Sequence, residues 1–249
     1  MPMTSGSKLA SLAEAVSRVP DGACVAIGGH DGRRSPMALI CEIIRQGCTG
    51  LRLVGWDGGF AFDLLEAAGC AASVETGPAV RDRIRAAALG WTAAPSGAGA
   101  PSLALRPDVV LLHGEWADSV GDVRFPVETW EPESPDLLLA QAGASVIASV
   151  EQIVSAEAIT RRATDPCLPG ATIACVAEAP YGAYPTACET RYEVAEQALA
   201  EAVAAIRAPE TLDAWLDAHV FGPADHWSAL DRIGARRLLG VTRDRVLRV

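Results

Sequence analysis

The feature that most constrains the fold is a buried strand that runs directly into glycine. The apolar run Ala23–Ile27 ends at Gly28 and Gly29, and apolar residues at helical spacing follow at Met37–Gln46. This run is too continuous for a strand with one face in water, so we expect the strand Cys24–Ile27 to be covered on both faces. A strand, a glycine turn and a helix in succession indicate a parallel sheet with covering helices.

The same cycle recurs along the chain. Leu51–Val54 is predicted as the next strand, Gly58 and Gly59 as its turn, and Ala61–Ala68 as the following helix. A capping box at Ser11 predicts that the first helix begins there, and another helix is predicted at Arg81–Leu89. Further strands are predicted at Asp108–His113, Ser145–Val150 and Thr172–Val176. From about residue 191 the pattern is helical, at Val194–Ala205, Thr211–His219 and Ala224–Ile233. We therefore expect residues 1–249 to form a single α/β domain, a Rossmann-like parallel sheet with a helical C-terminal extension.

Charge and composition exclude several classes of function. The chain of 249 residues carries 31 acidic and 21 basic side chains, a net charge of −10, which argues against nucleic acid or an anionic membrane as the main partner. It has no apolar run long enough to span a bilayer and no signal-peptide pattern at its N-terminus. Seven cysteines without Cys-x-x-Cys spacing favour a reduced, cytoplasmic protein, and four isolated histidines argue against a metal site.

The loops that follow the strands hold the first candidate site, because ligands of open parallel sheets bind beyond the carboxyl ends of the strands. Gly28 and Gly29 would let the main chain approach a ligand with bare amides, and Arg33 or Arg34 would pair with phosphate or carboxylate. On this view a Gly29→Val substitution abolishes activity and leaves the fold largely intact. The alternative is a tight turn with two surface arginines, and the spacing lacks the G-x-G-x-x-G fingerprint of dinucleotide binding.

Other strand ends add candidates with open alternatives. Gly58 and Gly59 form either a second binding turn or a loop that passes close to its neighbour. His113 either orients a substrate or is a hydrogen-bonded structural histidine. Glu151 follows an apolar run and either serves catalysis or, as we prefer, caps the loop and helix that come next. Residues Glu178–Ala187, with two prolines and two tyrosines, would wall a pocket or dock a partner.

Together these segments resemble the α subunit of the family I coenzyme A transferases, in the glutaconate CoA-transferase branch and close to the CoA-dependent ring hydrolases of steroid degradation. The N-terminal signature of that family fits in register, with His30 in place of phenylalanine and Arg34 in place of glycine; the matching positions are Asp21, Gly22, Val25, Ala26, Ile27, Gly28, Gly29 and Pro36. Later segments fit in the family's order, namely LRPDVVLLHGEWADSVGD, SVEQIV, VAEAPYGAYPTA and FGPADHWSAL.

The resemblance implies a CoA-transferase-type fold that pairs with a homologous β subunit, as αβ or α2β2, and acts on an acyl-CoA. Coenzyme A would be part of the substrate, and no other cofactor is implied. In the transferases a glutamate of the β subunit, within Ser-Glu-Asn-Gly, attacks the thioester. This sequence lacks that motif, so we expect the chain to be inactive as a transferase without its partner.

The ring-hydrolase relatives instead imply a catalytic glutamate in the α-like subunit. Glu75 is the nearest match, ahead of a helix that resembles Arg85–Gly90, with Asp82 as a second candidate and a solvated strand-end carboxylate as the alternative. His30 would add a hydrogen-bond donor or a base. The stretch 71–101 is shorter than in family members, which implies a different acyl substrate or a lost activity. Three functions follow: a transferase subunit, a hydrolase or C–C bond-cleaving subunit, or a non-catalytic scaffold.

Overall fold

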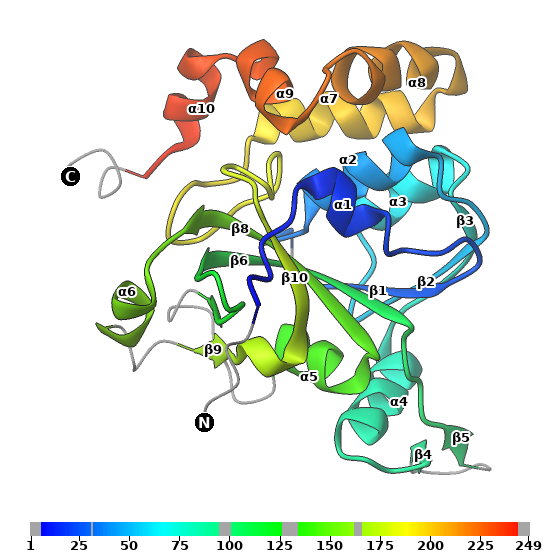
Figure 1. Cartoon of the computed structure of the whole chain (residues 1–249). Helices are drawn as coiled ribbons and strands as arrows, with labels where there is room; N and C mark the ends of the chain where they lie inside the picture. Colours follow the sequence, from blue (N-terminus) through cyan, green and yellow to red (C-terminus); the bar gives the residue numbers. More distant parts are fainter. Residues whose placement is uncertain (1–5, 31, 95–100, 126–133, 162–165, 244–249) are drawn as a thin grey trace.

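The computed structural model describes residues 6–30, 32–94, 101–125, 134–161 and 166–243. Its strands are β1 (Cys24–Ile27), β2 (Leu51–Gly55), β3 (Ala71–Glu75), β4 (Ala93–Ala94), β5 (Ser102–Leu103), β6 (Val109–Ala117), β7 (Val123–Arg124), β8 (Ser145–Ile153), β9 (Cys167–Leu168) and β10 (Ile173–Glu178). The central sheet has the order β10-β8-β6-β1-β2-β3, all parallel, with β7 antiparallel to β6 and to β9 (Figure 1). β4 and β5 form a separate antiparallel pair.

Helices cover both faces of this sheet. They are α1 (Leu12–Val16), α2 (Met37–Gln46), α3 (Phe60–Ala67), α4 (Pro78–Ala88), α5 (Pro135–Ala142), α6 (Ala156–Arg161), the 3-10 turn η2 (Gly170–Thr172), α7 (Glu196–Arg207), α8 (Pro209–Leu216), the π-helical turn η3 (Asp217–Phe221), α9 (His226–Ile233) and α10 (Ala235–Val241). In Figure 1, α1, α2 and α3 lie on one face and α4 and α5 on the other, while α7 to α10 form an outer layer above α2 and α3. None of the helices in the described part of the chain combines the length and apolar character needed to cross a bilayer.

Alternate residues of each strand fill two separate cores. Ile27 of β1 and Leu111 of β6 pack with α1 to α3, whereas Val110 and Leu112 of β6 pack with α4 and α5. The C-terminal helices contribute to the first core through Leu212, Leu216 and Val220. Burial on both faces explains the continuous apolar runs of the sequence. The predicted α/β fold with a parallel sheet and C-terminal helices is confirmed.

Local signals explain where the first helices begin and end. The Ser11 side chain accepts a hydrogen bond from the Glu14 amide at 3.1 Å, and the Glu14 carboxylate accepts one from the Ser11 amide at 2.8 Å, which is the predicted capping box. Helix α2 has the predicted bounds and ends at Gly47, which adopts the left-handed conformation with φ +68°. These signals lie within a few residues of the helix, so the sequence predicts them well.

Several elements were not predicted, among them β3 and α5. β3 lies at the sheet edge with exposed side chains, so it lacks the apolar run by which the other strands were identified. α5 begins with Pro135 and Asp136 and is almost wholly buried. The predicted connection Ala93–Pro101 falls mostly outside the described residues, although Ala93–Ala94 form β4.

The strand order places a topological switch point between β1 and β6. From β1 the chain proceeds outward to β2 and β3, and from β6 it proceeds in the opposite direction to β8 and β10. Ligands of open α/β sheets bind beyond the carboxyl ends of the strands at such a point. The Gly28–Gly29 turn follows β1 there.

Candidate active site

The Gly28–Gly29 turn is closed by the protein itself. The Gly28 amide donates to the Leu111 carbonyl at 2.9 Å, and the Gly29 amide donates to Asp136 Oδ1 at 2.8 Å. A Cβ on Gly28 would lie 2.6 Å from that same carboxylate oxygen, and one on Gly29, at φ +81°, would lie 2.4 Å from the Arg33 carbonyl oxygen. The prediction of bare amides at this turn is therefore wrong. The prediction that Gly29→Val leaves the fold largely intact is contradicted too, because the side chain would strike main-chain atoms.

The Arg34 side chain is buried near the switch point. Its side chain is 1% exposed, pairs with Asp136 and with Glu189 at 3.2 Å, and lies 5.6 Å over the Phe125 ring. Burial lowers the pKa of the guanidinium, but the two carboxylates raise it by more, so its pKa is raised overall. Arg34 thus binds carboxylates of its own chain, and its role in ligand binding stays a prediction that this pairing does not support. The exposed Arg33 keeps that role as a prediction.

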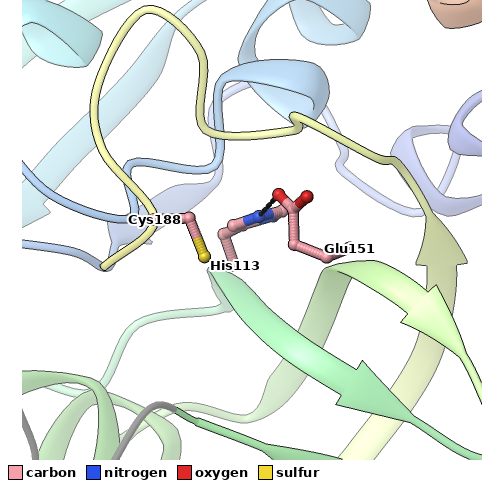
Figure 2. Close-up of side chains that lie close together, drawn as sticks. All are labelled: His113, Glu151 and Cys188. Atoms are coloured by element: carbon pink, nitrogen blue, oxygen red, sulfur yellow. Dashed lines mark hydrogen bonds and ion pairs between the residues drawn. The ribbon is translucent and has the colours of Figure 1, made fainter. Parts of the chain in front are cut away.

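A second closed region lies along β6 and β8, which continue past His113 and Ser149 to Ala117 and Ile153, so His113 does not end its strand as predicted. His113 Nε2 donates to Glu151 Oε1 at 2.7 Å, and His113 Nδ1 lies 2.9 Å from the Ser149 hydroxyl. The Tyr192 hydroxyl donates to Glu151 Oε1 at 2.7 Å and the Tyr181 amide to Glu151 Oε2 at 2.9 Å. Figure 2 shows how the His113 and Glu151 side chains, which come from β6 and β8, converge. Of the two alternatives for His113, the structure shows the hydrogen-bonded structural histidine.

Glu151 anchors the loop of residues 179–192 to the sheet through Tyr181 and Tyr192. Helix α6, which follows β8, is capped by Ser155 instead: the Ala158 amide donates a hydrogen bond to the Ser155 hydroxyl at 3.3 Å. The preferred prediction, that Glu151 caps that helix, is therefore wrong. The sequence did contain a signal, because His113 and Ser149 are register partners on neighbouring strands, and Glu151 lies two residues along on the same face.

Cys188 completes the cluster with a protonated thiol. Its Sγ and the ligand atoms of His113 and Glu151 lie within 4.8 Å of one another, all three residues are buried, and Figure 2 shows the sulfur beside the pair. Burial, and then Glu151, raise the pKa of the Cys188 thiol well above its usual range, and the same two causes raise the pKa of Tyr192. A protonated thiol is neither a nucleophile nor a metal ligand. Because both Glu151 oxygens already accept hydrogen bonds, the cluster is best described as a clamp that holds the loop.

The Gly58–Gly59 turn, at the carboxyl end of β2, is open. Both glycines are exposed. A Cβ on Gly58 would meet only Thr76 Oγ1, at 3.9 Å, and one on Gly59 would meet nothing within 4 Å. Gly59 has φ +139°, a conformation that glycine tolerates, and is the N-cap of α3. A ligand can therefore approach this main chain, which it cannot do at Gly28.

Cationic side chains from α4 lie beside this open turn. Arg81 donates to the Trp56 carbonyl at 2.8 Å, pairs with Asp57, and places its guanidinium 5.4 Å over the Trp56 ring. Arg85 stacks on the same ring at 5.6 Å. Guanidinium groups held on an indole suit an anionic group such as a phosphate. The sequence analysis missed these residues, although their spacing of four puts both on one face of a helix.

The two predicted catalytic residues lie apart. His30 is half-buried, and its Nδ1 has no hydrogen-bond partner among the described residues. Glu75 is exposed at the end of β3 and accepts a hydrogen bond from Arg83 at 2.9 Å. The strands that precede or contain them, β1 and β3, are separated by β2, so these strands lie about 10 Å apart. Asp82 pairs with Arg85 at 3.2 Å. Catalytic roles for these residues stay predictions.

Sequence comparison gives a family match for the N-terminal part. The family model described as coenzyme A transferase matches residues 9–90. One of the subunits of glutaconate CoA-transferase from Acidaminococcus fermentans is 32% identical over 134 residues, which cover 54% of this chain and 41% of that protein. The chain spans less than two thirds of the length of the curated relatives that it matches, 63% and 41%.

Solved structures match nearly the whole chain. The crystal structure of glutaconate coenzyme A-transferase from Acidaminococcus fermentans superimposes with a TM-score of 0.86 at 24% identity, covering 95% of this chain and 96% of that one. The decarboxylase AibA/AibB, solved as a cysteine-to-serine variant, gives a TM-score of 0.69 at 31% identity, covering 84% of this chain and 97% of that one. The first match establishes the shared fold, and the second adds sequence identity over almost the full length of the related chain. This chain therefore belongs to the coenzyme A transferase family, as an α-subunit-like member.

Proposed function

We propose that this chain is the α-type subunit of a heteromeric CoA-transferase-like enzyme that acts on an acyl-CoA thioester. The active site lies at the carboxyl ends of the strands and is completed by a β subunit. Coenzyme A enters as part of the substrate, and no other cofactor takes part. The Acidaminococcus relative, which is named as one subunit of its enzyme, and the two-part name AibA/AibB support assembly with a second chain.

The observation that carries this proposal is the open turn at Gly58–Gly59. It offers main chain that a ligand can reach, whereas the turn at the switch point is sealed by protein atoms. The guanidinium groups of Arg81 and Arg85 next to it suit the phosphates of coenzyme A. Arg81 and Arg85 are paired with Asp57 and Asp82, so they offer hydrogen-bond donors to a phosphate at this edge rather than a net positive charge.

A partner supplies the transferase nucleophile on this proposal. Three carboxylates from α5, β8 and the loop of residues 179–192, namely Asp136, Glu151 and Glu189, are buried and bound to donors or cations of their own chain. A carboxylate that attacks a thioester has to reach it with an unshared oxygen. These three do not meet that condition, which supports an attacking carboxylate from the β subunit, while this chain binds and orients the substrate.

A second candidate is hydrolysis or C–C bond cleavage of a CoA thioester. It is favoured by the 31% identity to a chain of the decarboxylase AibA/AibB. The exposed Glu75 and the unpartnered Nδ1 of His30 are the groups of this chain that could take part. Because their strands are separated by β2, they would act at different atoms rather than as a pair.

Product analysis separates the candidates. The complex of this chain with its β subunit is incubated with acyl-CoA donors and a set of free carboxylates, glutaconate among them, and the products are identified by mass spectrometry. Transfer of coenzyme A to a free carboxylate supports the transferase. Release of free acid, carbon dioxide or a cleaved acyl group supports the second candidate. An unchanged acyl-CoA with every donor overturns both and leaves a non-catalytic scaffold.

A further inference from the structure

A cavity of about 340 Å³ lies beneath the C-terminal helices, and Phe60, the residue after Gly59 of the open turn, is part of its wall. One side of its wall comes from α2 and the loop of residues 179–192, and the other side comes from α7, η3, α9 and α10. Neither Gly28, Gly58, Glu75 nor His113 lines it. Its volume is at the lower end of the range of small-molecule sites, about 300 to 1,000 Å³. Nothing in the proposed acyl-CoA function uses this space.

The walls are mostly apolar and partly aromatic. Met37, Phe60 and Trp215 line the cavity, and the Trp215 ring stacks on His219 with centroids 4.5 Å apart. Such a surface binds a hydrocarbon body by removing it from water. The ligand therefore has an apolar part, and the volume limits that part to a small molecule.

The charges at the cavity are mainly positive. Three arginines, Arg45, Arg232 and Arg237, line it, against a single carboxylate, Glu201. In a chain with 31 acidic and 21 basic residues this local excess of cations is the reverse of the overall balance. An anionic group would be attracted here.

The three arginines differ in how far they are already engaged. Arg45 pairs with Glu42, and Arg232 donates to the Ala218 and Gly222 carbonyls at 3.1 and 3.0 Å. The Arg237 amide donates to the Gly234 carbonyl at 3.1 Å, but its side chain makes no hydrogen bond or ion pair with another described residue. The Arg237 guanidinium interacts electrostatically with the hydroxyl of Tyr184, a residue that also lines the cavity. Arg237 is therefore the guanidinium that is free to bind a ligand.

We propose that this cavity binds a small amphipathic carboxylate, with its apolar body among Met37, Phe60 and Trp215 and its carboxylate on Arg237. The Tyr184 hydroxyl is placed in the same wall to donate a second hydrogen bond. The cavity adjoins the open turn at Phe60, but its lining does not include Gly58, Gly59, Arg81 or Arg85. Binding here requires neither a second chain nor a thioester.

Calorimetric titration of the full chain with octanoate, hexanoate and 1-octanol tests the proposal. Hexanoate should bind about 15-fold more weakly than octanoate, because each methylene contributes about fourfold in affinity. The affinity for octanol should be lower than that for octanoate by a factor of about ten or more, because octanol lacks the charge-assisted hydrogen bond to Arg237. Equal binding of octanoate and octanol, or no binding of octanoate at millimolar concentration, would overturn the proposal.

Matched variants locate the site. Arg237→Gln should weaken octanoate to the level of octanol and leave octanol unchanged, which also shows that the cavity is still folded. Arg236→Gln, at the exposed neighbouring residue that does not line this cavity, should leave both affinities unchanged. Ala229→Phe, which fills the cavity from α9, should abolish binding of both. Equal effects of the two arginine substitutions would refute the assignment. Because no acyl-CoA is present, this result is independent of the proposed enzyme activity.

Discussion

At the scale of single residues, the charged side chains near the glycine turns have partners that the sequence does not indicate. Arg34 looks like a ligand-binding cation, because it follows a glycine turn at a strand end. Its two partners, Asp136 and Glu189, lie 102 and 155 residues away along the chain. Pattern analysis has no means of pairing residues at such separations, so the buried ion pairs appear only in the fold. We propose that Arg81 and Arg85, which lie over the Trp56 ring, have the role that was predicted for Arg34.

Arg34→Gln should destabilise the protein by about 3–5 kcal/mol, because it leaves two buried carboxylates without a cation. Urea denaturation at neutral pH measures the change in the free energy of unfolding. Arg33→Gln, at the exposed neighbouring position, is the matched control and should change stability by no more than about 0.5 kcal/mol. Equal stability of the two variants would show that the Arg34 ion pairs are not structural.

At the scale of elements, the sequence predicts those that carry their own local signal. α2 has a glycine stop and β1 an apolar run, and both were predicted with the bounds that the structure shows. β3 has exposed side chains and is held by pairing with β2, and α5 is held by packing against the sheet. The open and closed turns could not be told apart either, because both are glycine pairs after a strand. Only the tertiary neighbours of Gly28 and Gly58 distinguish them.

The closed turn can be tested with two glycines of the same loop. Gly29 and Gly32 both have positive φ, +81° and +71°, but a Cβ meets main-chain atoms at Gly29 and open space at Gly32. Gly32→Ala should cost about 1 kcal/mol from backbone strain alone. Gly29→Ala should cost about 1–3 kcal/mol more, because the main chain has to move. Chemical denaturation gives both values, and the same cost at both positions would contradict the close packing.

At the scale of the whole molecule, all seven cysteines are free thiols whose pKa values are raised, chiefly by burial. The folded state therefore holds these protons more tightly than the unfolded chain, in which a thiol ionises near pH ~8.5. The corresponding stability is fully present below that pH and is lost as pH rises. For Cys41 and Cys70, with the pKa raised to about 11, the loss extends to about pH 11.

The free energy of unfolding should accordingly fall between about pH 8.5 and about pH 10.5. In the Cys41→Ala/Cys70→Ala double variant the slope against pH should be shallower by up to about two protons per molecule, whatever its starting stability. Urea denaturation at a series of pH values measures both slopes. A wild-type stability that stays constant over this range would contradict the burial of the thiols.

The central claim is that acyl-CoA meets this chain at the open turn of β2, and the most direct test is to fill that turn. Gly58→Leu introduces a side chain without backbone strain, because Gly58 is not left-handed and its nearest neighbour is 3.9 Å from the new Cβ. Gly6→Leu, also in open space, is the matched control. Acyl-CoA turnover by the complex with the β subunit should fall about 100-fold in Gly58→Leu and stay at the wild-type rate in Gly6→Leu, with equal unfolding midpoints. Wild-type turnover in Gly58→Leu would contradict the placement of the active site.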